Sequence, residues 1–154
     1  MTSVIKSSTK GAYKQGESKD CTVRALANGT GMTYEEAHVV MKTCGRSDRK
    51  GARLGAVLDA FEKLKLKPIF ISTNTKDGRY LRKHFNYQPW DEGISLGKAV
   101  KRFNKGRYIA LVDSHVVALV DGALIDIFDN RSRQYLRALF EVQETFEQTI
   151  TNNS

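Results

Sequence analysis

Apolar residues recur every three or four positions in the first half of the chain, which is the spacing of amphipathic helices. Asn28-Gly29 is a stop signal after the first such segment, and a capping box formed by Thr33 and Glu36 starts the second. Pro68 cannot continue the third helix because it lacks a backbone N–H. The expected helices span residues 20–28, 33–43 and 52–64.

Runs of β-branched and aromatic residues of strand length dominate the second half. Strands are expected at 68–72, 107–113, 114–120, 123–129 and 134–142. Between the first two of these, Ser95 is expected to cap a helix that runs to Phe103, and a short helix is expected near 80–85. Helices followed by antiparallel strands predict an α+β domain.

A tight turn at Asp121-Gly122 joins two of these strands, because this dipeptide is typical of two-residue β-hairpin loops. The turn fixes the pairing register of the hairpin. His115 and Asp126 then lie on one face as diagonal neighbours, with Cα atoms roughly 7–8 Å apart. Asn130 shares that face if the strand continues, so it is an alternative partner for the imidazole.

The chain has 154 residues, 40% of them hydrophobic and 27% charged, which is typical of one soluble globular domain. Its apolar runs are too short to span a bilayer, and its first residues lack the apolar core of a signal peptide. We therefore expect a single cytoplasmic domain, 1–154, that does not associate with membranes. Its polar ends, 1–12 and 144–154, are expected to be flexible.

The formal net charge of +8 favours anionic partners. Basic residues gather at 46–53, 98–107 and 131–137, and aromatic residues are interspersed with basic ones at 80–90. These clusters predict either ordinary solvated faces or contacts with nucleic acid or an acidic protein. The aromatic rings either stack on bases, anchor a protein partner or fold onto the core.

Cys21 stands at the start of the first helix, where a thiolate is stabilised by the helix dipole. A neighbouring imidazolium makes such a thiolate a strong nucleophile, so His115, oriented by Asp126, is its candidate base. Gln15 is a candidate donor to a developing oxyanion, together with the Cys21 N–H. The alternative is that Cys21 is an ordinary core cysteine.

Cys44 is expected to be a passive thiol at the end of the second helix. The spacing of cysteines and histidines matches no metal-binding pattern, and phosphate-binding glycine loops are absent from the sequence. The sequence therefore predicts neither a metal nor a cofactor.

The order Gln15, Cys21, His115, Asp126 resembles that of the papain-like cysteine peptidase superfamily. In that superfamily the cysteine begins a central helix, a glutamine precedes it by six residues, and the histidine starts a strand of the sheet. The segments DCTVRALANGTGMTYEEAH, KGRYIALVDSHVVALVDG and LIDIFDNRSR are similar to those of small papain-like domains in tailed bacteriophages. The resemblance covers roughly residues 13–137.

This resemblance implies a papain-like fold, with N-terminal helices packed on a C-terminal antiparallel sheet. It also implies a thiol hydrolase of the host cytoplasm, a peptidase, isopeptidase or amidase that acts on a protein or peptide. Thr22 and Asp20 depart from papain, which has a tryptophan after the cysteine and a small residue before it. The alternative is a non-catalytic basic protein on the same scaffold, which inhibits a host enzyme or defence factor or binds nucleic acid.

Overall fold

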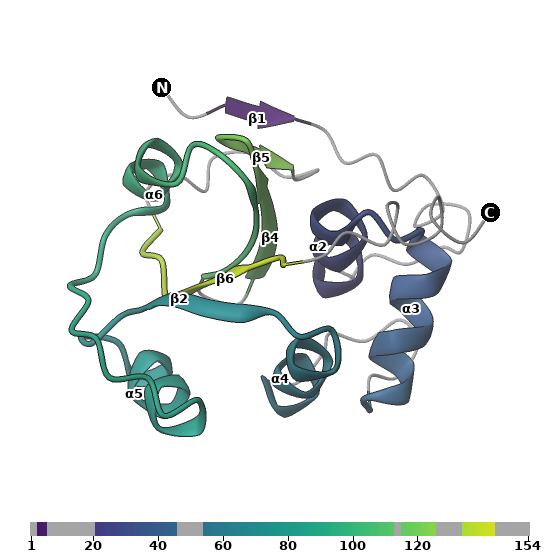
Figure 1. Ribbon diagram of the computed structural model, residues 1–154, viewed down its shortest axis with the longest axis horizontal. Coiled ribbons are helices and arrows are strands. Elements are labelled where there is room, and N and C mark those ends of the chain that lie inside the picture. The colour runs from purple at the N-terminus through teal and green to yellow at the C-terminus, as the bar shows by residue number, and fades with distance from the viewer. Residues whose placement is uncertain (1–2, 6–20, 46–53, 113–114, 126–133, 144–154) are drawn as a thin grey trace.

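The computed structural model describes residues 3–5, 21–45, 54–112, 115–125 and 134–143, which form helices and one sheet (Figure 1). The helices of this part of the chain are α2 (Cys21–Thr30), α3 (Tyr34–Thr43), α4 (Leu54–Lys63), α5 (Lys76–His84) and α6 (Leu96–Arg102). Its strands are β1 (Ser3–Ile5), β2 (Lys67–Ile71), β3 (Arg107–Val112), β4 (His115–Val120), β5 (Ala123–Ile125) and β6 (Ala138–Glu141). The mixture of helices and sheet confirms the α+β class.

The strands form one sheet in the order β1-β5-β4-β3-β6-β2. Every pair is antiparallel except β1 with β5, which is parallel. β1 lies inside the segment 1–12, for which the sequence predicts flexibility and no strand. The sequence of residues 1–12 does not predict this strand, because β1 pairs with β5, which lies more than a hundred residues later in the sequence.

The predicted hairpin register between β4 and β5 is confirmed. Val120 pairs with Ala123 across the two-residue turn. Asp121 and Gly122 have φ values of 49° and 81°, the left-handed conformation that this kind of turn requires at both positions. Asp126 follows the last described residue of β5 and lies outside the described part of the chain, as does Asn130.

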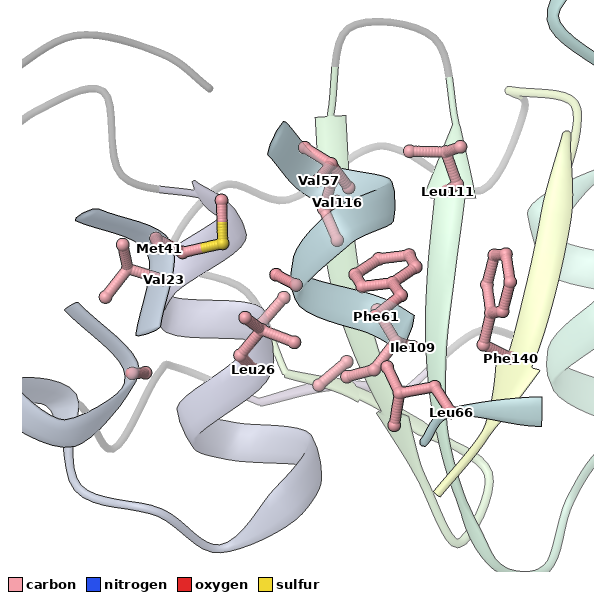
Figure 2. Packing of buried hydrophobic residues seen from close by; sticks show 14 of the residues in the cluster. Val23, Leu26, Met41, Val57, Phe61, Leu66, Ile109, Leu111, Val116 and Phe140 are labelled. Carbon is pink, nitrogen blue, oxygen red and sulfur yellow. The ribbon is translucent and has the colours of Figure 1, made fainter. Parts of the chain in front are cut away.

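Helices cover both faces of the sheet. Side chains of α2 and α4 pack on one face, where Figure 2 shows Leu26 and Phe61 gathered near Ile109. The rings of Phe61 and Phe140 meet there edge to face, with centroids 4.8 Å apart. On the opposite face, Leu96 and its neighbours on α6 pack in a second apolar cluster. The N-terminal helices therefore cover one face as expected, and α6 covers the other.

Alternation along β4 separates the two apolar clusters. Val116 and Ala118 belong to the cluster on the α2 side, whereas Val117 and Leu119 belong to the cluster on the α6 side. This is the two-residue period of a strand buried on both faces. β4 is thus a central strand whose position is fixed by packing from both sides.

Helix α2 is buried along its length, and it continues past the predicted stop at Asn28-Gly29. It ends at Thr30, before Gly31, which has a φ of 83°. Gly29 lies inside the helix, where an added Cβ would collide with the side chain of Ile109. The absence of a side chain at Gly29 therefore lets α2 approach the sheet closely, and the predicted helix stop is wrong for this reason.

Helices α3 and α6 begin at their predicted caps. The hydroxyl of Thr33 accepts a hydrogen bond from the Glu36 N–H at 3.1 Å, and the Glu36 carboxylate accepts one from the Thr33 N–H at 3.2 Å. Ser95 caps α6 as expected. α5 begins at Lys76, before the predicted start at residue 80, because Thr75 supplies its N-cap. Within the described ranges, every helix is too short or too polar to cross a membrane.

Candidate functional site

Cys21 and His115 meet at one end of the sheet. Cys21 is the first residue of α2, and α2 packs along β4, whose first residue is His115. The Cys21 side chain forms a hydrogen bond with the His115 side chain. The thiol is partly buried, and His115 is only 6% exposed. The structure thus brings together the two residues that the sequence order singled out.

The contact is made where β4 begins. Strict alternation would assign His115 to the α6 side, together with Val117 and Leu119. Cys21, in contrast, packs against the cluster on the α2 side. His115 is the first residue of β4, and its side chain reaches the N-terminus of α2, where it forms the hydrogen bond with Cys21.

The surroundings of Cys21 favour the thiolate. Burial raises the pKa of the Cys21 thiol, but the hydrogen bond and the charge of His115 act in the opposite direction. The backbone N–H of Val116 and the hydroxyl of Thr22 also donate hydrogen bonds to the sulfur. The result is a pKa below the ordinary value of a cysteine, despite the burial.

The position at the start of α2 adds backbone donors. The first N–H groups of an α-helix have no partner within the helix, and the helix dipole places partial positive charge there. Cys21 is the first residue of α2, so its own N–H belongs to this set. The site therefore combines a thiol, an imidazole and a backbone N–H at the start of a helix.

Cys44 has a different environment. It forms the C-cap of α3, where carbonyl groups and the negative end of the helix dipole are exposed. Cys44 is a free and partly buried thiol like Cys21, so it is an internal reference for the reactivity of Cys21.

The two other histidines have their own contacts. His84 Nε2 on α5 lies 2.5 Å from Glu62 Oε1 on α4, and this contact joins the two helices. The ring of His38 packs against Tyr34, with centroids 5.9 Å apart. Of the three histidines, His115 is therefore the one that contacts Cys21.

Three of the predicted site residues lie outside the described part of the chain: Gln15, Asp126 and Asn130. Their roles stay predictions. Two contributors to the site were missed, the Thr22 hydroxyl and the Val116 N–H. The contribution of Thr22 could have been predicted from the sequence, because Thr22 directly follows Cys21 in the first turn of the helix. The contact with the Val116 N–H could not, because it depends on tertiary packing.

Comparison of the chain with family models, with curated proteins and with solved structures gives no significant match. The functional inference therefore depends on the site itself.

Proposed function

We propose that this protein is a papain-like thiol hydrolase in which Cys21 attacks the carbonyl carbon of an amide. The observation that carries the proposal is the hydrogen bond between Cys21 and His115 at the N-terminus of α2, where the pKa of the thiol is lowered. A lowered thiol pKa in a partly exposed site next to a histidine is typical of a catalytic cysteine and not of an inert core thiol.

In the first half of the reaction, the Cys21 proton resides on His115, and the thiolate attacks the substrate carbonyl. The Cys21 N–H stabilises the oxyanion, and the Gln15 amide is its expected second donor. His115 then protonates the leaving nitrogen. The C–N bond breaks, a C–S bond remains, and the amine departs, leaving a thioester on Cys21.

In the second half, a water molecule attacks the thioester while His115 accepts its proton. The C–S bond breaks, the carboxylic acid departs, and the thiol–imidazole pair is restored. The reaction needs no cofactor. Asp126, or Asn130 in its place, is the expected group that orients the imidazole, because the confirmed hairpin register leads the chain of β5 directly into that segment.

The fold supports the same class of protein. A cysteine begins a helix that packs on the antiparallel part of the sheet, and a histidine is the first residue of the strand beside it. This is the arrangement that the resemblance to the papain-like superfamily predicts. We propose a protein or peptide amide as substrate, which makes the activity that of a peptidase, isopeptidase or amidase.

The selectivity of alkylation tests this proposal. Native protein is treated with limiting iodoacetamide at pH 6, and the alkylated cysteines are quantified by peptide mass spectrometry. We expect Cys21 to react much faster than Cys44, because the ordinary thiol is only about 0.3% ionised at this pH, whereas His115 favours the Cys21 thiolate. Cys44→Ala is the matched control, and it should leave the rate at Cys21 unchanged. Equal rates at the two cysteines would contradict the proposed activation.

A further inference from the structure

The edge of the molecule that carries α5, α6 and the connection between them combines positive charge with an exposed tryptophan, remote from Cys21. In Figure 1 these two helices lie on the left of the molecule, on opposite faces of the sheet, and α2 and α3 lie on the right. We define the α5–α6 surface by Lys76, Arg79, Lys83, Trp90, Lys98 and Lys101. All six side chains are exposed. The proposed thiol chemistry uses none of them.

Helix α5 contributes a row of cations. Lys76, Arg79 and Lys83 follow one another at intervals of three and four residues, so they lie on the same side of the helix. Tyr80 lies on this side too and is 52% exposed. Leu81 is fully buried in the core and holds the helix against the protein. The basic side of α5 therefore faces solvent in a fixed orientation.

Helix α6 contributes a second group. Lys98 and Lys101 are exposed, whereas Leu96, Ala99 and Val100 are buried in the apolar cluster beneath. The helix sequence, LGKAVKR, contains no acidic residue. Its outer side is thus positively charged along the whole helix.

The connection between α5 and α6 carries Trp90, and this segment is anchored to the sheet through Asp91. Asp91, the next residue, forms a backbone bridge with Ser72 at the end of β2. Its carboxylate accepts hydrogen bonds from the Ile71 N–H at 3.1 Å and from the Tyr87 hydroxyl at 2.7 Å. Trp90 itself is 78% exposed, although the segment that carries it is anchored to the sheet. The anchored segment therefore keeps the indole ring accessible to a ligand.

We propose that the α5–α6 surface binds single-stranded nucleic acid, with its basic side chains on phosphates and Trp90 stacked on an unpaired base. Cations that follow a backbone together with an exposed aromatic ring are the usual elements of such sites. The net charge of +8 attracts the same kind of ligand over a longer range. An acidic protein would satisfy the cations but offers the indole no base, and a duplex keeps its bases within the stack.

The fluorescence of Trp90 tests the proposal directly, since it is the only tryptophan of the chain. A short oligothymidylate titrated into the native protein should quench this fluorescence in a saturable, salt-dependent manner. Lys98→Gln combined with Lys101→Gln should lower the slope of log affinity against log salt by about 1.4, at about 0.7 for each lost phosphate contact. Trp90→Ala should weaken binding of a labelled oligonucleotide by about 5- to 150-fold, measured by anisotropy.

A matched control removes the same charge elsewhere. Lys63→Gln combined with Lys67→Gln replaces two exposed lysines near the α4–β2 connection, and it should leave the salt slope close to that of the native protein. Cys21→Ser should bind as the native protein does. The proposal would be overturned by an absence of quenching, by equal quenching with polyglutamate, by equal affinity for a duplex, or by an equal loss of slope in the control.

Discussion

The His115→Asn variant is expected to lose the selective reactivity of Cys21. At pH 6 the rate of alkylation of Cys21 should fall by about a hundredfold, to that of an ordinary thiol or below it. The reason is that His115 supplies both the hydrogen bond and the charge that oppose the effect of burial on this thiol. Without the imidazole, only the hydrogen bonds from the Val116 N–H and the Thr22 hydroxyl oppose the effect of burial. The pKa of Cys21 therefore rises, and the fraction of thiolate falls.

The rate at each cysteine is measured by time-resolved alkylation and peptide mass spectrometry, and circular dichroism checks that the variant is folded. His38→Asn is the matched control, because His38 packs on Tyr34 in a different part of the protein. Cys44 provides a second reference within the same sample. A folded His115→Asn protein whose Cys21 still reacts as fast as in the native protein would show that the imidazole does not activate the sulfur.

Gly29→Ala is expected to lower the free energy of unfolding by about 1–3 kcal/mol, the usual cost of overpacking a core. The new methyl group would collide with the δ-methyl of Ile109, and Ile109 is fully buried, so it can move only into other core atoms. The higher helix propensity of alanine returns at most about 1 kcal/mol. The collision should therefore dominate, as measured by urea unfolding.

Two further variants isolate this cause. At Gly55 an added Cβ meets no atom within 4 Å among the described residues beyond its own helix backbone and chain neighbours. Gly55→Ala should therefore keep or raise the stability, by up to about 1 kcal/mol. Ile109→Val removes the methyl group that Gly29→Ala meets. Alone it should cost about 0.5–1.5 kcal/mol, but in the Gly29→Ala background it should restore stability. Strictly additive losses in the double variant would contradict the close approach of α2 to the sheet.

Local sequence signals predicted much of the fold because their determinants lie within a few residues. The capping box at Thr33 and Glu36 and the hairpin turn at Asp121-Gly122 both depend on short-range hydrogen bonds and backbone conformation. These features needed no knowledge of the remainder of the chain.

Features that depend on distant partners were not predictable in the same way. Gly29 reads as a helix stop in the sequence, but its role depends on Ile109, which lies eighty residues later. The parallel pairing of β1 with β5 likewise cannot be predicted from the three residues of β1 alone. The division of helices between the two faces of the sheet depends on the same long-range packing.

The candidate site, too, was predicted only in the features that depend on local sequence. The order of Cys21 and His115 and the position of each at the start of an element were readable from the sequence, and the structure places the two side chains in contact. The hydrogen bond from the Val116 N–H was not readable, because it arises from how α2 lies against β4. The acyl-enzyme itself is a chemical prediction that only a reaction can test.

Formation of a covalent intermediate tests the central claim most directly. The native protein is mixed with p-nitrophenyl acetate, quenched in acid, and its intact mass and peptide masses are measured. We expect a burst of p-nitrophenolate and one acetyl group on the Cys21 peptide, both lost in Cys21→Ala and both retained in Cys44→Ala. Acetylation that is absent, or that falls equally on Cys44 and on surface lysines, would contradict a nucleophilic role for Cys21.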